Sequence, residues 1–98
     1  MTLDDLRRAL DPERAALRAR GVRALYVFGS VARGEAGPRS DVDLLIEVDD
    51  DQPLSILDLV GIRDQLSGAF GISADVHLKD GLHWRIRDDV LREAVRVL

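Results

Sequence analysis

Two segments of the sequence alternate in polarity, so that each predicts a β-strand with one apolar face and one face bearing carboxylates. The apolar faces comprise Val42, Leu44, Ile46 and Val48 in residues 42–48, and Ile72, Ala74, Val76 and Leu78 in residues 72–79. Asp41 and Asp43 fall on the other face of the first strand, and Asp75 on that of the second. If the strands are neighbours, helices cover the apolar face and the three aspartates project together from the more open one.

The remaining predicted elements complete an α/β order. Residues 24–28 form a short apolar run rich in strand formers, which indicates a buried strand. Thr2 and Asp5 are typical of a helix capping box. Helices are expected over residues 1–20, 53–70 and 81–98. The order α-β-α-β-α-β-α, with the N-terminal segment broken into two helices, indicates a two-layer or three-layer α/β domain.

The apolar residues of the two long helices predict which sides are buried. The main stripes are Ile56, Leu59, Val60 and Leu66 in the first, and Leu82, Ile86, Val90 and Ala94 in the last. Three further positions fall off the first stripe and are either a partner surface or part of a broader core face: Leu54, Leu57 and Ile62. The aromatic residues expected in the core or at its edge are Tyr26, Phe28 and Trp84.

Composition and charge exclude several classes of protein. The absence of cysteine from the 98 residues excludes disulfides and thiolate metal sites. The N-terminus is charged and unlike a signal peptide, and no run approaches the roughly 18 apolar residues of a membrane span, so a cytoplasmic protein is expected. The net charge of −4 disfavours sequence-independent binding to nucleic acid. Residues 49–53 are interpreted as a solvated acidic loop.

The three aspartates predict a cation site. Asp41 and Asp43 are separated by about 7 Å along a strand, and together with Asp75 they repel one another when all are charged. A divalent cation removes that repulsion, and oxygen ligands favour Mg²⁺ or Mn²⁺, which complete their coordination with water and phosphate oxygens. A nucleoside triphosphate is therefore the expected ligand. His77 shares the face of Asp75 and is expected to be a partly exposed strand histidine.

A glycine-serine pair predicts the phosphate end of the same site. Gly29 follows the strand at residues 24–28 directly, and Ser30 is expected to open a short helix. Backbone N–H groups at a helix start attract phosphate, and glycine places no Cβ in the way. Arg33, one turn later, adds a guanidinium whose geometry suits phosphate oxygens.

These motifs resemble a known family. The segment GSVARG at residues 29–34, followed by SDVDLLIEV at residues 40–48, resembles the signature of the DNA-polymerase-beta-like nucleotidyltransferase superfamily. The aspartate in ADVHL and the terminal LREAVRVL resemble its minimal nucleotidyltransferase branch. The resemblance implies an α/β fold with a small mixed sheet of about three to four strands and helices mainly on one face. The length of 98 residues indicates a single domain over residues 1–98, and the resemblance covers residues 21–98, the expected catalytic core.

The resemblance also implies roles for individual residues. The residues that hold the triphosphate of ATP are expected to be Gly29, Ser30 and Arg33. Asp41 and Asp43 are expected to bind two Mg²⁺ ions, with Mn²⁺ as an alternative. Asp75 matches by spacing and strand context only, and is expected to help bind the metal under the attacking hydroxyl and to activate that hydroxyl.

The resemblance finally implies a partner. Members of the minimal branch are often encoded beside a helical HEPN-type protein and act as its antitoxin, some by transferring AMP from ATP to a tyrosine of that partner. We therefore expect AMP transfer to a hydroxyl of a HEPN-type toxin with which this chain assembles. Two alternatives stay open. One is a catalytically degenerate module that neutralises a helical partner by covering it, and the other is a small-molecule nucleotidyltransferase completed by a helical subunit.

Overall fold

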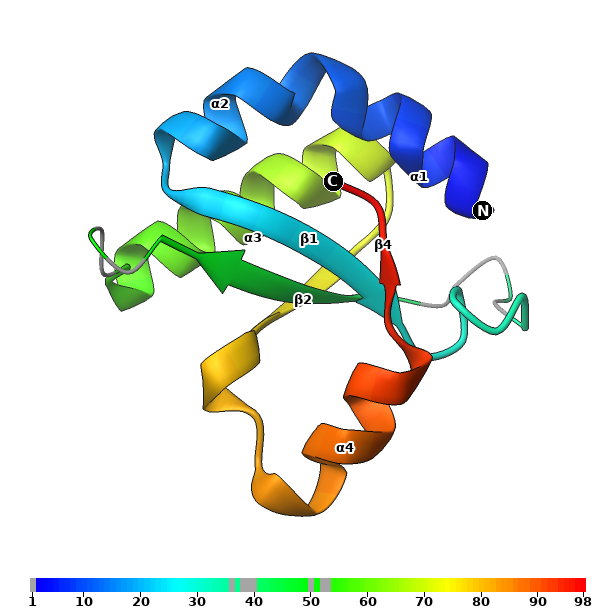
Figure 1. Ribbon diagram of the computed structural model, residues 1–98. Coiled ribbons are helices and arrows are strands. Elements are labelled where there is room, and N and C mark those ends of the chain that lie inside the picture. Colours follow the sequence, from blue (N-terminus) through cyan, green and yellow to red (C-terminus); the bar gives the residue numbers. More distant parts are fainter. Residues whose placement is uncertain (1, 36, 38–40, 50, 52–53) are drawn as a thin grey trace.

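The computed structural model describes residues 2–35, 37, 41–49, 51 and 54–98. In this part of the chain four strands form one sheet, in the order β3-β2-β1-β4 (Figure 1). The strands are β1 (Val22–Phe28), β2 (Val42–Val48), β3 (Ala74–Leu78) and β4 (Val95–Arg96). The helices are α1 (Leu3–Leu10), α2 (Arg14–Ala19), α3 (Ile56–Phe70) and α4 (Trp84–Glu93), with short 3₁₀ turns at Asp11–Glu13 and Lys79–Gly81.

The sheet is mixed, as expected. β1 pairs antiparallel with β2 and with β4, whereas β2 and β3 are parallel and are joined by a crossover through α3. The predicted bounds of β2 are confirmed, while β1 begins two residues earlier than expected. The register places Asp43 opposite Phe28 on one side and opposite Asp75 on the other. The two predicted carboxylate strands are therefore neighbours.

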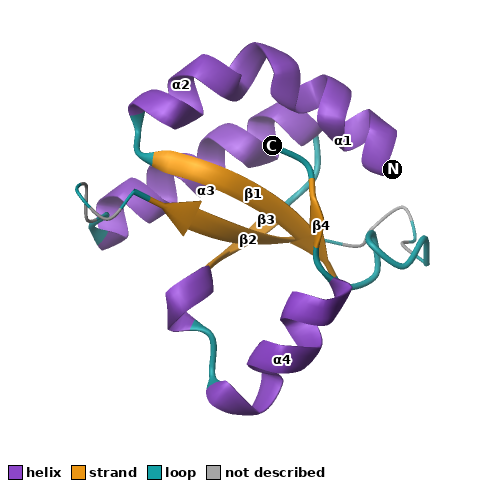
Figure 2. Ribbon diagram, in the orientation of Figure 1, coloured by secondary structure: helices purple, strands orange, loops and turns teal. Residues whose placement is uncertain are grey.

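The helices cover the two faces of the sheet unequally. α1, α2 and α3 lie on one side of the sheet, and α4 lies on the opposite side (Figure 2). The apolar face of β2 is buried under the first three helices, with Val42 and Leu44 fully buried in the main hydrophobic cluster. Of the buried hydrophobic residues in the described part of the chain, three stand outside that cluster: Ala24, Leu45 and Val90. Leu45 lies on the same face of the sheet as Asp43 and is fully buried, so the face that bears the carboxylates is also partly covered.

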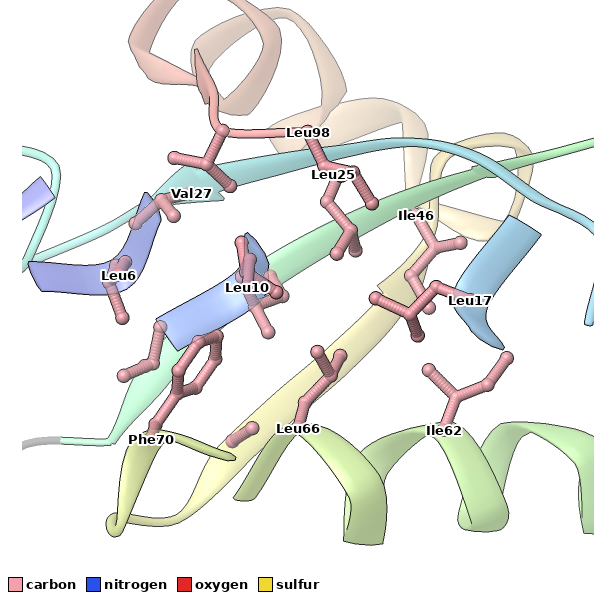
Figure 3. Close-up of a cluster of buried hydrophobic side chains, with 14 of the residues drawn as sticks. Leu6, Leu10, Leu17, Leu25, Val27, Ile46, Ile62, Leu66, Phe70 and Leu98 are labelled. Carbon is pink, nitrogen blue, oxygen red and sulfur yellow. The ribbon is translucent and has the colours of Figure 1, made fainter. Parts of the chain in front are cut away.

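α3 buries a different side from the one expected. Ile62 and Leu66 are fully buried and point from α3 toward Leu17 of α2 (Figure 3), whereas Ile56 is 79% exposed and Val60 is 37% exposed. The prediction that Ile56 and Val60 face the core is wrong, although Leu66 is confirmed. The physical reason is that apolar residues occur on nearly every side of α3. The packing of α1 and α2 against it decides which side is buried.

Both ends of α3, and the start of α1, follow their sequence signals. The Asp5 backbone N–H donates to the Thr2 hydroxyl at 3.1 Å, so the predicted capping box of α1 is confirmed. α3 starts with a second capping box, in which the Asp58 backbone N–H donates to the Ser55 hydroxyl at 3.2 Å. Gly71 closes α3 with a φ of 72°, in the left-handed region that favours glycine.

The C-terminal segment differs most from expectation. α4 ends at Glu93, and the chain continues as β4 along β1, so the helix predicted over residues 81–98 is too long. Of its predicted stripe only Val90 is buried, and Ile86 is 51% exposed. Trp84, expected in the core, is 74% exposed. Val97 N–H donates to the Leu25 carbonyl at 2.9 Å, a ladder bond that depends on a strand far away in the sequence.

The other predicted features stand as follows. Tyr26 and Phe28 are half-buried, as expected of residues at the core edge. In the predicted acidic loop Asp51 is exposed and Asp49 is half-buried, and residues 50, 52 and 53 lie outside the described residues. Among the described helices, none has the length and the apolar character needed to cross a membrane. The assignment of the catalytic core to residues 21–98 stays a prediction.

Candidate active site and metal centre

Three polar side chains converge at one end of the β2–β3 pair. Asp43 lies opposite Asp75 in the parallel register, and His77 follows two residues later on the face of Asp75. Each of the three offers one ligand atom, and these atoms all lie within 4.8 Å of one another. His77 Nε2 lies 3.2 Å from Asp75 Oδ2. We call Asp43, Asp75 and His77 the acidic corner.

The electrostatics of the acidic corner disfavour a bare carboxylate at Asp43. Burial raises the pKa of Asp43 above its ordinary value, and the negative charges of Asp75 and Asp41 add to the rise. The positive charges of His77 and Arg33 oppose it. A divalent cation would offset both the burial and the repulsion, so the donor set fits one. Two carboxylates suit Mg²⁺ or Mn²⁺, and an imidazole nitrogen is a donor that transition ions accept more readily than Mg²⁺ does.

Gly29 lies directly against Asp43. β1 ends at Phe28, and Gly29 then turns the chain with a φ of 75°, in the left-handed region. A Cβ built on Gly29 would lie 2.4 Å from Asp43 Oδ2, closer than real Cβ contacts permit. The backbone conformation therefore favours glycine here, and any larger residue would also have to displace the Asp43 carboxylate. In this structure the group that lies against Gly29 is the Asp43 carboxylate, and the expected close approach of a phosphate stays a prediction.

The segment after Gly29 is a turn and not the expected short helix. The Arg33 N–H donates to the Gly29 carbonyl at 3.1 Å, and the Glu35 N–H donates to the Ser30 carbonyl at 2.8 Å. Gly34 has a φ of 72°, which ends any helical continuation after one turn. The prediction that Ser30 opens a helix is therefore wrong. Ser30 itself is half-buried and lies in this turn, beside the residue that contacts Asp43.

Arg33 bridges the turn and α4. Its Nε donates to Glu35 Oε2 at 3.0 Å, and its Nη1 donates to Glu93 Oε1 in α4. These hydrogen bonds raise the pKa of Arg33, which is charged in any case. Its charge reaches Asp43 and opposes the rise in the pKa of that carboxyl. Arg33 therefore lies near the acidic corner with two of its donors already engaged by carboxylates.

His77, but not Asp41, is among the described residues whose ligand atoms converge. Asp41 is exposed, one residue before β2, and is not among the three residues whose ligand atoms converge. Its charge nevertheless reaches Asp43 and raises the pKa of that carboxyl. His77 is a half-buried strand residue, as expected, and its imidazole also belongs to the acidic corner. The two-residue spacing between Asp75 and His77 was the signal for this placement.

Comparison with known proteins places these features in a family. A family model described as "Nucleotidyltransferase domain" matches residues 13–97. "Protein adenylyltransferase MntA" of Thermococcus cleftensis is 39% identical over 98 residues, which cover 99% of this chain and 97% of that protein. A solved structure named "putative minimal nucleotidyltransferase" is 37% identical, with a TM-score of 0.80, and the match covers 97% of this chain and 95% of that one.

A second solved structure extends the likeness of fold. It is named "Crystal structure of the toxin-antitoxin with AMP-PNP" and is 18% identical, with a TM-score of 0.73 over 88% of this chain and 69% of that one. At this identity the likeness concerns the fold alone. The nucleotidyltransferase fold expected from the motifs is thus confirmed by the solved structures. The family model and the relatives that match nearly end to end show that the chain belongs to the nucleotidyltransferase domain family, among its minimal nucleotidyltransferases.

Proposed function

We propose that this nucleotidyltransferase transfers AMP from ATP to a hydroxyl of a helical HEPN-type toxin and thereby acts as its antitoxin. The observation that carries the proposal is the acidic corner, in which Asp43, Asp75 and His77 converge beside the Gly29 turn. The name of the relative from Thermococcus cleftensis supports a protein acceptor. The toxin–antitoxin description of the second solved structure supports a toxin partner. A cytoplasmic location and a stable complex with the partner stay predictions.

The residues divide into a metal side and a phosphate side. We assign two Mg²⁺ ions, or Mn²⁺, to Asp41, Asp43 and Asp75, with His77 as an added donor. A bound divalent cation supplies positive charge to the triphosphate and to the departing pyrophosphate. Gly29 and Ser30 offer backbone and hydroxyl donors to the β- and γ-phosphates. Arg33 holds the same phosphates through its guanidinium.

The chain's own groups account for proton movement. The acceptor hydroxyl oxygen attacks the α-phosphorus, so a new O–P bond forms while the bond from the α-phosphorus to the bridging oxygen breaks and pyrophosphate leaves. Asp75 accepts the hydroxyl proton as that bond forms. His77 Nε2, 3.2 Å from Asp75 Oδ2, orients the carboxylate toward the acceptor. Leu45, fully buried on the same face of the sheet, provides an apolar floor next to these groups.

The test is transfer of radiolabel from α-³²P-ATP to the co-expressed helical partner. Wild-type protein should label the partner with AMP, on tyrosine first, and should leave bulk DNA and RNA unlabelled. Asp43→Asn and Asp75→Asn should abolish labelling, whereas the matched charge change Asp51→Asn, in an exposed loop residue, should leave it unchanged. An unlabelled partner that is still inhibited at equal stoichiometry would contradict the proposal and favour the binding module.

A further inference from the structure

A shallow groove adjoins the acidic corner along the first two turns of α3. Its volume is about 140 Å³, and we call it the α3 groove. The residues that line it are Ile56, Leu59, Val60, Arg63, Asp75 and Val76. The four helical positions follow the spacing i, i+3, i+4 and i+7, so they share one side of α3. Asp75 closes the groove at the end where the acidic corner begins.

The apolar wall of the groove includes side chains that are exposed to solvent. Ile56 is 79% exposed, and Val60 is 37% exposed, although the same helix buries Ile62 and Leu66 completely. The exposed side chains are therefore not the core-facing side of an amphipathic helix. Clustered apolar side chains at the surface mark interaction sites more often than single exposed ones do.

The position of the groove separates it from the proposed nucleotide side. Gly29 and Arg33 follow β1, which neighbours β2 on one side, whereas Asp75 lies in β3, its neighbour on the other side. The triphosphate donors and the α3 groove thus flank the acidic corner from opposite directions. An acceptor has to approach from the direction away from the leaving pyrophosphate, because attack and departure are in line. The α3 groove lies on that side.

We propose that the α3 groove binds the polypeptide segment that carries the acceptor hydroxyl. This inference rests on the proposed function, in which Asp75 receives the acceptor's proton. A volume of about 140 Å³ admits side chains rather than a folded element, so the segment lies along the groove and inserts an apolar side chain next to its hydroxyl residue. Arg63, whose side chain is 52% exposed and lies 3.5 Å from Asp64 in an exposed ion pair, can turn to an acidic residue of the same segment.

The test compares two double variants that remove exposed apolar surface. Ile56→Ser with Val60→Ser alters the groove wall. Trp84→Ser with Ile86→Ser is the control, because Trp84 and Ile86 of α4 are 74% and 51% exposed and neither lines the groove. Urea unfolding checks that both double variants fold. If the groove variant does not fold, the single change Ile56→Ser, at the more exposed of its two positions, replaces it.

We measure steady-state AMP transfer to the helical partner, and binding of that partner by calorimetry, for the wild-type protein, the groove variant and the control variant. The groove variant should raise KM and Kd for the partner by about tenfold or more. Its kcat at saturating partner and its KM for ATP should match those of the control variant. Equal KM and Kd for the partner in groove and control variants would overturn the inference, as would a wild-type protein that does not bind the partner.

The same experiment separates this inference from the proposed function. Partner labelling by wild-type and control proteins decides the proposed function, independently of the groove variant. If the partner binds but is not labelled, the proposed function fails, and the difference in Kd between the groove and control variants still decides the groove. If labelling occurs equally in all forms, the proposed function holds and the groove inference fails.

Discussion

Replacement of Gly29 by alanine tests the geometry of the site most sharply. With a φ of 75°, alanine at position 29 must adopt a left-handed conformation, which costs about 1–2 kcal/mol. Its Cβ would also lie 2.4 Å from Asp43 Oδ2, so the carboxylate has to leave its rotamer, which adds about 0.5–1.5 kcal/mol. We therefore expect Gly29→Ala to lower the free energy of unfolding by about 1.5–3.5 kcal/mol.

A matched substitution isolates the contact with Asp43. Gly34 has a φ of 72°, close to that of Gly29, but a Cβ there meets nothing within 4 Å in the described part of the chain. Gly34→Ala should therefore cost only the backbone term of about 1–2 kcal/mol. A domain of this length is stable by roughly 5–15 kcal/mol, so both variants should remain folded.

The assay is equilibrium unfolding in urea without ligands, followed by circular dichroism. The difference in the free energy of unfolding between the two alanine variants measures the cost of displacing Asp43. The slope of that free energy against urea concentration should be the same for both variants. Nucleotide transfer should fall further in Gly29→Ala than in Gly34→Ala, because only the first change moves a residue of the acidic corner. Equal loss of stability in the two variants would refute the claimed contact between position 29 and Asp43.

Further substitutions probe the core, an ion pair and the phosphate side. In urea unfolding, Ile62→Ala should cost about 2–5 kcal/mol and exposed Ile56→Ala less than about 0.5 kcal/mol, which reverses the expectation from the apolar stripe. The hydrogen bond from Lys79 lowers the pKa of Glu47. The ionised Glu47 carboxylate stabilises the fold fully above the ordinary pKa of glutamate, and this stabilisation is lost as the pH falls through the lowered pKa of the folded state. Glu47→Gln should therefore make the free energy of unfolding less dependent on pH in the acidic range. Arg33→Ala should raise the KM for ATP about tenfold or more while changing kcat less.

Local sequence patterns predicted the features that depend on a fixed spacing between residues. The alternation of Val42, Leu44 and Ile46 identified the apolar face of β2, because a strand has only two faces and the other one bears the carboxylates beside Leu45. The same alternation placed Asp43 and Asp75 on one face of neighbouring strands. Capping at Thr2 was equally predictable, because it involves residues three apart in the sequence.

Features that depend on distant partners were not predictable in this way. The residues of β4 form a strand only because β1 lies beside them, and nothing within Val95–Leu98 encodes that neighbour. Apolar residues surround α3, so the choice of Ile62 over Ile56 as a core residue was made by the packing of α1 and α2.

Some features of the candidate site follow from local sequence patterns, and others depend on contacts between distant segments. Gly29 and the aspartates were found from their motif, because tight turns and strand alternation are local. The pairing of Arg33 with Glu93 joins the turn to α4 across the fold, and was not visible in the sequence. His77 was placed on the correct face by alternation, but its convergence with Asp43 depends on the parallel register of β2 and β3.

The central claim is that the acidic corner binds a divalent cation together with a nucleoside triphosphate. The most direct measurement is the free energy of unfolding in urea with ATP and Mg²⁺, separately and together, for wild-type protein and Asp43→Asn. At an ATP·Mg²⁺ concentration of 100 times Kd, wild-type protein should gain about 2.7 kcal/mol, more than with either component alone. Asp43→Asn should gain almost none, while its stability without ligands should equal or exceed that of the wild type, because one of the repelling charges is gone. No gain by wild-type protein with Mg²⁺ or Mn²⁺ at millimolar ATP, or an equal gain by Asp43→Asn, would contradict the claim.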